Sequence, residues 1–394
     1  MIRSNFLTAC AIVALAINLR PVMAAIGPLL DQIQVATGLD HAGASLLTAL
    51  PIAVMGLGAL LGGPLQRRGQ ERRYVAIGIT LIAAACVARA TLRTGSGLLV
   101  TSLVAGGGIA VIQALLPGFV KRTWGRQAGR VMGLYTTGIM GGAALAAALA
   151  APLANALGWS GALTVWALPT LIALPLWLAG APRSAEPRAS RQSGSDAAPP
   201  VWRELRAWEL MLFFGVGTGA YALVLAWLPP FYMELGWSRV QAGNLLGGVT
   251  VAEVIAGLCV STWVDRMPDR RKPLLLILTM LVSGLLCLLI APQSLALPAC
   301  VLLGFGIGAL FPMSLIVTLD HADDPGRAGE LAAFVQGGGY LIASMAPLGA
   351  GALRDRFADL SGAWLAMVFG MALLALMCMR FSPRSFTQFA PNKS

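Results

Sequence analysis

The sequence predicts an all-α membrane protein with twelve transmembrane helices arranged in two pseudo-symmetric six-helix bundles. Its composition is the first observation: 57% of the 394 residues are hydrophobic and 11% are charged, against about 25% charged residues in a typical soluble domain. A membrane span needs about 20 apolar residues, so the chain has room for roughly twelve spans and no large soluble domain. Strands are not expected, because an open strand leaves its backbone unsatisfied in lipid and these runs lack the alternation of barrel strands.

Long apolar runs, separated by clusters of charge, give the expected spans in order. The first run continues through Asn18-Leu19-Arg20-Pro21 into further spans, so we do not expect it to be a cleaved signal peptide. The expected spans are 6–30, 43–65, 74–92, 97–120, 129–157, 161–180, 208–235, 239–263, 273–291, 295–319, 329–353 and 361–380.

The basic residues predict the orientation of these spans. With a cytoplasmic N-terminus, 22 of the 28 Lys and Arg residues fall on the cytoplasmic side and four on the other, while Arg20 and Arg89 lie within or near the end of spans. This bias predicts that both termini are cytoplasmic in a bacterial inner membrane. The net charge of +11 is therefore a signal of topology, and no nucleic-acid partner is expected.

A proline- and serine-rich stretch at 181–207, with five arginines, cannot bury a core and is expected to be a cytoplasmic linker. It divides the chain into bundles at 1–180 and 208–394. The two bundles resemble each other, because Gly125-Arg126-Gln127-Ala128-Gly129 after the fourth span corresponds to Gly326-Arg327-Ala328-Gly329 after the tenth. A duplicated bundle of this kind is typical of transporters that work by alternating access.

The segment after the second span, Gly62 to Arg73, resembles the major facilitator superfamily signature Gly-x-x-x-Asp-Arg-x-Gly-Arg-Arg/Lys, with Gln66 in place of the acid. The corresponding segment of the second half keeps its acid as Asp265. The resemblance extends over essentially the whole chain and implies the major facilitator fold. It also implies a cytoplasmic conformational latch at Arg67, Asp265 and Arg266, weakened in the first half by Gln66.

Four further motifs resemble the cyanate and 2-nitroimidazole transporter family. They are Asn18-Leu19-Arg20-Pro21, Leu47-Thr48-Ala49-Leu50-Pro51, Tyr221 with Trp227-Leu228-Pro229, and Gln336 with Gly339-Tyr340. This family implies small, polar and often planar substrates, although no motif here singles out cyanate. The glycine-rich fifth span lacks the Gly-Pro pair of drug/proton antiporters, which makes multidrug exchange less favoured.

Arg20 is the first candidate site residue. It lies about 21 Å along a helix from Phe6 and about 12 Å from Pro28, roughly two thirds of the way across the membrane. A guanidinium there can offer a planar fork to an anionic or planar substrate, or it can snorkel or pair with a neighbouring helix. Pro21 favours the first interpretation, because prolines inside spans free backbone carbonyls near sites.

Glu253 is the only acid deep inside an expected span. An isolated carboxyl in the membrane can carry a proton or face Arg20 across the two halves. The alternative is a protonated structural carboxyl that is hydrogen-bonded within its own half.

Neutral side chains on the expected cavity helices complete the candidate substrate site, because a polar group facing lipid is costly. Gln336 and Tyr340 share one helix face at i, i+4, while Trp227 can also be an interface belt residue. The candidates are Asn18, Gln113, Tyr221, Trp227, Gln336 and Tyr340.

Other polar residues are interpreted as structural. Arg89 is expected to be an interface anchor, and Asp320-His321 a latch or a solvated loop. The six scattered cysteines and two histidines indicate neither a disulfide framework nor a metal site, and no phosphate-binding glycine loop is present. No cofactor is expected.

The sequence therefore predicts a monomeric secondary transporter in the inner membrane for a small polar or anionic planar solute, with Glu253 as the candidate proton carrier. It is not expected to be an enzyme, because no intramembrane Ser/His pair, paired Asp or histidine cluster is present. Two alternatives stay open: an efflux carrier for small amphiphilic drugs and a transport-inactive membrane sensor.

Overall fold

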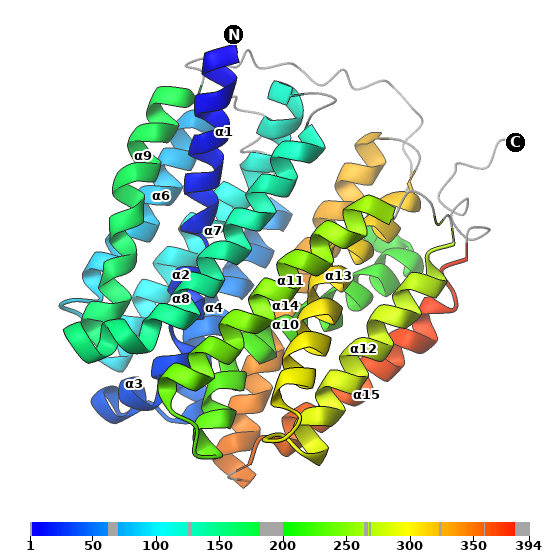
Figure 1. Ribbon diagram of the computed structural model, residues 1–394. Helices are drawn as coiled ribbons and strands as arrows, with labels where there is room; N and C mark the ends of the chain where they lie inside the picture. The colour runs from blue at the N-terminus through cyan, green and yellow to red at the C-terminus, as the bar shows by residue number, and fades with distance from the viewer. Residues whose placement is uncertain are drawn as a thin grey trace, which may run out of the picture.

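The computed structural model describes residues 2–61, 70–124, 128–181, 200–263, 267, 269–322, 325–357 and 359–382. These residues form helices joined by turns, and no strand occurs among them. Figure 1 shows the helices of the N-terminal part on one side and those of the C-terminal part on the other. The all-helical fold class predicted from composition is confirmed.

The first half contains the helices up to Gly180. They are α1 (Ile2–Ile17), α2 (Pro21–Ala24), η1 (Gly27–Leu29), α3 (Leu30–Thr37), α4 (His41–Leu61), α6 (Glu71–Ala88), α7 (Gly95–Trp124), α8 (Ala128–Thr164), η3 (Val165–Ala167) and α9 (Leu168–Gly180).

The second half begins beyond residue 200. Its helices are η4 (Val201–Arg203), α10 (Leu205–Glu234), α11 (Arg239–Trp263), α12 (Arg271–Ile290), α13 (Ala296–Asp320), α14 (Pro325–Phe357) and α15 (Ser361–Cys378).

Within the part of the chain that the structure describes, each of the twelve expected spans coincides with helix, although two of them need explanation. Ten helical stretches of the described residues are long and apolar enough to cross a membrane, and one of them, Val131–Gly180, covers two expected spans. Its helix is interrupted at Gly158, where φ is 72° and ψ is 164°, a conformation that glycine adopts without steric cost. The expected span at 74–92 is α6, which lies outside those ten stretches.

The first span is a broken helix. α1 ends at Ile17, and the chain resumes helical structure at Pro21 in α2. Proline cannot donate a backbone hydrogen bond and its ring clashes with the preceding turn, so a helix normally ends just before it. Arg20 therefore sits at the break, as the residue that precedes the first turn of α2.

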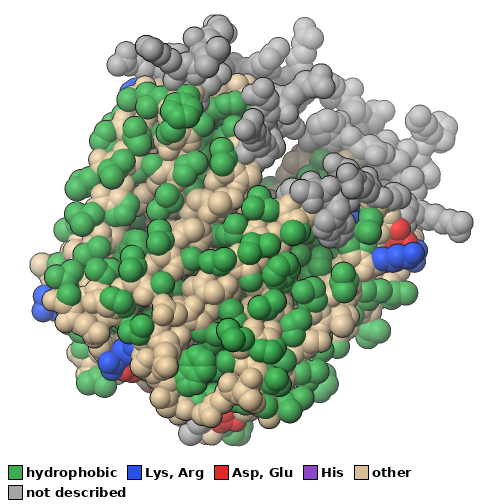
Figure 2. All heavy atoms as spheres, in the orientation of Figure 1, with side chains coloured by type: hydrophobic (Ala, Val, Ile, Leu, Met, Phe, Trp, Pro, Cys, Tyr) green, Lys and Arg blue, Asp and Glu red, His purple; other side chains and the backbone are tan. Residues whose placement is uncertain are grey.

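The outer surface carries many apolar side chains. Leu171, Leu276, Phe369 and Leu376 are each more than 60% exposed. Figure 2 shows hydrophobic side chains spread over the visible face, with the coloured charged side chains near its edges. A soluble monomer rarely exposes so continuous an apolar surface, whereas lipid requires one.

The two halves meet along two pairs of helices, with α4 packed against α14 and α8 against α11. We call the end of the bundle where α9 ends and α10 begins the linker end, and the other end the opposite end. At the opposite end, the Arg239 guanidinium of the second half forms a forked pair with Asp31 of the first half, in which Nη2 donates to Oδ2 at 2.5 Å and Nε donates to Oδ1 at 3.2 Å. This pair joins the halves there.

A second contact between the halves also lies at the opposite end. The Asp355 carboxylate, at the end of α14, accepts hydrogen bonds from the backbone amides of His41 and Ala42 at 3.0 and 2.8 Å. Amides at the start of a helix such as α4 have no partner within the helix, and the helix dipole there favours negative charge. The carboxylate therefore caps a helix of the other half.

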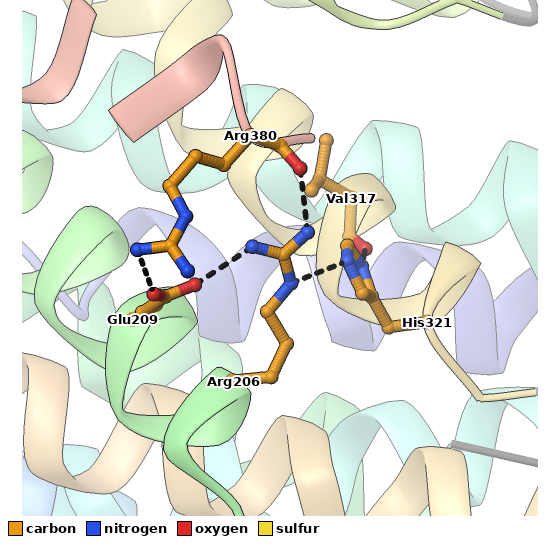
Figure 3. Close-up of polar contacts among 5 residues, drawn as sticks. All are labelled: Arg206, Glu209, Val317, His321 and Arg380. Carbon is orange, nitrogen blue, oxygen red and sulfur yellow. Dashed lines mark hydrogen bonds and ion pairs between the residues drawn. The ribbon is translucent and has the colours of Figure 1, made fainter. Parts of the chain in front are cut away.

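The expectation of an interdomain latch or a solvated loop at Asp320-His321 is wrong for the histidine. His321 contacts Arg206 and Val317 of its own half. His321 is fully buried within a cluster of polar contacts at the linker end of the second half (Figure 3). Arg206 Nε donates to His321 Nε2 at 3.1 Å, while His321 Nδ1 lies 2.7 Å from the carbonyl oxygen of Val317. Because Nε2 accepts, the ring proton is assigned to Nδ1, which donates to Val317.

Arg206 holds this cluster together. Its guanidinium also contacts Glu209 at 2.7 Å and the backbone carbonyl of Arg380 at 2.6 Å, and the Arg380 side chain pairs with Glu209 at 2.7 Å. The start of α10, the end of α13 and the segment after α15 are thereby joined (Figure 3). The polar residues that follow His321 in the sequence predict a solvated position, and they give no sign of the contact from α10.

Candidate functional site

A cavity of about 610 Å³ lies between the two halves. Its wall comes from α4, α7 and α8 of the first half and from α10, α11, α13 and α14 of the second, together with Arg20 at the break of the first span. Met132 and Gly329, near the starts of α8 and α14, belong to the wall, so the cavity extends toward the linker end. Arg20 and Glu253 are its only charged residues among those that the structure describes.

Arg20 is buried in this wall, with 5% of its surface exposed. Its guanidinium lies over the ring of Tyr221, 5.3 Å from the ring centroid. Its Nε is buried without a hydrogen-bond partner, and none of the described residues forms an ion pair with it. Burying a charge in this way is costly unless something pairs with it, so the geometry is suited to a polar or anionic solute.

Glu253 reaches the cavity from α11, in the other half, and is 4% exposed. Gly308 allows the close approach of α13, because an added Cβ at that position would collide with the Glu253 backbone. Arg20 is an electrostatic neighbour of Glu253, yet no direct ion pair joins them within the described part of the chain. A guanidinium and a carboxyl group thus face one cavity from different halves without contact.

Three of the five tyrosines in the chain line the same cavity: Tyr135 on α8, Tyr221 on α10 and Tyr340 on α14. All three are electrostatic neighbours of Arg20. The hydroxyl oxygens of Tyr135 and Tyr221 are buried and have no hydrogen-bond partner. The Tyr340 ring packs edge-on against Phe214, with a centroid distance of 5.4 Å.

Tyr135 is not among the site residues that the sequence predicted. The sequence does contain a feature that could have indicated it: a tyrosine inside an apolar span needs a partner for its hydroxyl, as Tyr221 and Tyr340 do. Tyr135 lies close to Gln113, although the two side chains do not meet hydrogen-bond geometry.

The structure brings most of the expected substrate residues together. Gln113, Gln336, Tyr221 and Tyr340 line the cavity with Arg20. Gln336 and Tyr340 present an amide and a phenol from one face of α14, as their spacing predicts.

Two expected residues do not line this cavity. Asn18 lies in the break of the first span, where its Nδ2 donates to the carbonyl of Ala14 at 2.7 Å. Trp227 is 1% exposed and lies toward the opposite end, where its Nε1 donates to the carbonyl of Pro347 at 3.0 Å. Trp227 also packs against the His41 ring, with centroids 5.8 Å apart.

Arg89 is not an interface anchor, which corrects the expectation from sequence. It is 1% exposed, and its guanidinium donates to Thr101 Oγ1, Ser102 Oγ and the carbonyl of Val22. Val22 lies in α2, two residues beyond Arg20, so Arg89 ties the broken first span to α6 and α7. The expected latch residues Arg67, Asp265 and Arg266 lie outside the described residues.

Comparisons with known proteins agree with this architecture. The chain is 36% identical over 378 residues to the cyanate transport protein CynX of Escherichia coli, covering 96% of this chain and 97% of that one. It is 32% identical to the 2-nitroimidazole transporter of the same organism, covering 96% and 95%.

Solved structures share the fold at low sequence identity. A D-xylose-proton symporter superposes with a TM-score of 0.76 at 15% identity, covering 96% of this chain and 98% of that one. A bacterial homolog of the human lysosomal transporter Spinster, in an inward-facing and occupied conformation, gives 0.74 at 15% identity, with 100% and 99% coverage. The model of the Major Facilitator Superfamily matches residues 6–347, and the chain therefore belongs to this superfamily of membrane transporters.

Proposed function

We propose that this protein is a secondary transporter that moves a small polar or anionic planar solute across the bacterial inner membrane by alternating access. One observation carries the proposal: Arg20 is buried without an ion pair in a cavity between the two halves, with Glu253 on the other half. Transporters of this architecture place their solute near the midplane, between their repeats. The relatives named for cyanate and 2-nitroimidazole transport support solutes of this size.

The arrangement suggests how the two halves act. Arg20 binds the solute from the first half, while Gln336, Tyr221 and Tyr340 contact it from the second. The cavity reaches the linker end, and the Asp31–Arg239 pair and the Asp355 cap hold the opposite end together. Exposing the cavity to the opposite side requires these contacts to separate and the linker end to close.

Glu253 is the proposed proton carrier. A carboxyl that is removed from water, without a hydrogen bond or an ion pair, is disfavoured in its charged form. Protonation from one side and release to the other would couple solute movement to the proton gradient. Arg20 lies across the cavity from Glu253. An anionic solute bound to Arg20 would offset its positive charge and so change the electrostatic field at Glu253.

The test is uptake into proteoliposomes of labelled cyanate, thiocyanate, formate and 2-nitroimidazole, with and without a pH gradient. We expect at least one of these solutes to exchange across the membrane and to accumulate when the gradient is present. Solute movement no greater than in protein-free liposomes, for all four compounds, would contradict the proposal.

The coupling role is tested separately with Glu253→Gln, which keeps the side-chain volume and mimics the neutral carboxyl. We expect solute binding and downhill exchange to persist while accumulation driven by the pH gradient is lost. If Glu253→Gln still concentrates solute in response to the gradient, Glu253 is a structural carboxyl and another group carries the proton.

A second candidate function is efflux of small amphiphilic compounds, which the apolar part of the cavity wall favours. Met55, Met132, Met140 and Phe311 line it, and methionine side chains adapt to varied ligands. This function predicts that Arg20→Ala leaves transport intact while Phe311→Ala impairs it. The proposed function predicts instead that Arg20→Ala impairs transport more than Phe311→Ala does.

A further inference from the structure

We propose that the end of the cavity at Arg20 is a hydrogen-bond donor site for a small monoanion that accepts hydrogen bonds and donates none, with Tyr135 as a specificity-determining residue. The inference rests on the proposed transport function and narrows its substrate class. It adds a residue of the first half that neither the motifs nor the side-chain charges had indicated.

Three buried donors without partners carry the inference. Arg20 and Tyr135 are each 5% exposed and Tyr221 is 8% exposed. Arg20 Nε and the two hydroxyl oxygens are buried and have no hydrogen-bond partner. All three residues line one cavity, and both tyrosines are electrostatic neighbours of Arg20. The unpaired groups therefore gather around a single positive charge.

These donors come from both halves. Arg20 lies at the break of the first span and Tyr135 on α8, while Tyr221 lies on α10 of the second half. A solute held by all three therefore bridges the halves, which is the position from which binding can influence their movement. Tyr135 lies on a helix that packs against α11, the helix that carries Glu253.

The chemistry of the donors selects the ligand. A guanidinium has only N–H donors, and a phenol donates strongly to a negative acceptor. An anion with acceptor atoms and no N–H or O–H group can satisfy all three. A neutral amide such as urea brings its own N–H donors, which the Arg20 guanidinium cannot accept.

A purely structural role for the Tyr135 hydroxyl is disfavoured on energetic grounds. A buried hydroxyl without a partner destabilises the empty protein, because its hydrogen bonds to water are lost and not replaced. A phenylalanine would pack the same ring without that cost. The hydroxyl becomes favourable when a ligand accepts its hydrogen bond, so we expect binding and stability to change in opposite directions on its removal.

Calorimetric titration of the purified full-length protein tests the inference. The probes are sodium azide and sodium thiocyanate, which are linear monoanions without donors, and urea is the neutral comparison. Ionic strength is held constant with sodium gluconate. The variants are Tyr135→Phe and Tyr221→Phe. Tyr232→Phe is the matched control, because the Tyr232 hydroxyl donates to the carbonyl of Pro292 at 3.0 Å and Tyr232 does not line the cavity.

We expect the wild type and Tyr232→Phe to bind at least one of the anions and not urea. Tyr135→Phe should bind that anion about 10-fold to 100-fold more weakly, as expected for the loss of a hydrogen bond to a charged group. Its melting temperature without ligand should equal or exceed that of the wild type. Tyr221→Phe should weaken binding in the same direction.

The inference is overturned if neither anion binds the wild type, if urea binds as tightly as the anions, or if both Tyr135→Phe and Tyr221→Phe keep wild-type affinity. If Tyr135→Phe alone keeps wild-type affinity, Tyr135 is not a specificity residue and that part of the inference fails. Failure of the donor site is distinguishable from failure of the proposed function. Proteoliposomes that exchange neutral 2-nitroimidazole but no anion would retain the transport function and remove the anion site.

Discussion

Arg20 shows how a single residue acquires a role from a break in its helix. Pro21 ends the regular helix before it, and Arg89 holds the next turn through the carbonyl of Val22. The Arg20 guanidinium is thereby held in the cavity wall near Tyr221. We expect recognition of solute by Arg20 to depend on the planar fork as well as on the charge of its guanidinium.

Arg20→Lys keeps the positive charge and removes the fork, so we expect the apparent KM for the transported solute to rise about 10-fold or more. Uptake at varied solute concentrations in proteoliposomes measures this change. Arg93→Lys, in the exposed turn between α6 and α7, is the matched control and should leave KM unchanged. Unaltered affinity in Arg20→Ala would exclude Arg20 from the site.

His321 gives the protein a dependence of stability on pH. Burial lowers the pKa of the His321 imidazole, and the Arg206 charge acts in the same direction. The hydrogen bond to Val317 and the carboxylates of Asp320 and Glu209 oppose this shift without cancelling it. The folded protein therefore binds this proton less readily than the unfolded chain, whose histidine has a pKa of about 6.5. The stabilisation is present above that pH and is lost as the pH falls through it toward the lower folded-state value.

We expect the melting temperature to fall between about pH 7.5 and about pH 5.5, across the pKa range of an unperturbed histidine. His321→Gln can accept from Arg206 and donate to Val317 without titrating, so its melting temperature should fall less over this range. A parallel series with His41→Gln serves as the control for the other histidine. An identical pH dependence in the wild type and His321→Gln would assign the effect to other groups.

At the scale of helices, the contact of α4 with α14 closes the opposite end of the molecule. Gly351 on α14 lies against the start of α4, where an added Cβ would be 2.6 Å from the carbonyl oxygen of His41 and would also collide with Ser45 Oγ. Only a glycine allows the two backbones to approach so closely. The Asp355 cap lies one turn further along α14.

Gly351→Ala should therefore force the opposite ends of the halves apart and favour a conformation open on that side. Spin labels at Ser96→Cys, exposed in the first turn of α7, and at Ser294→Cys, in the exposed turn between α12 and α13, should give a longer distance distribution in this variant. Gly349→Ala is the matched control, because an added Cβ there meets nothing within 4 Å. Equal distributions in both variants would mean that the α4–α14 contact adjusts without opening.

At the scale of the whole molecule, the prediction concerns orientation. The basic residues predict that the linker end faces the cytoplasm, so the cavity is expected to be open to the cytoplasm in this conformation. The turn between α12 and α13 is then periplasmic, and η4 is cytoplasmic. The opposite orientation would reverse these assignments.

Labelling with a membrane-impermeant maleimide, in a background without the six native cysteines, measures the orientation. Ser294→Cys should react in spheroplasts and not in inside-out vesicles, because it should face the periplasm. Arg203→Cys should show the reverse, because η4 lies at the linker end. Reaction of both positions from the same side would contradict the twelve-span arrangement.

Local chemistry determined the spans and the first site residues. Twenty apolar residues in succession have few alternatives to a helix in lipid, and an arginine or a glutamate inside such a run is costly enough to indicate function. The break before Pro21 follows from the proline itself. The sequence predicted that Arg20, Glu253, Gln336 and Tyr340 line a common cavity, and the structure places all four in its wall.

Tertiary packing decided the rest. Packing brings Tyr135 into the cavity wall near Arg20, and Trp227 and Asn18 lie off the cavity because carbonyl oxygens hold their polar groups elsewhere. His321 is buried because Arg206, 115 residues away in the chain, reaches it. Periodicity and charge describe one helix at a time, whereas partners for buried polar groups come from helices distant in sequence. Only their packing shows which donors remain unpaired.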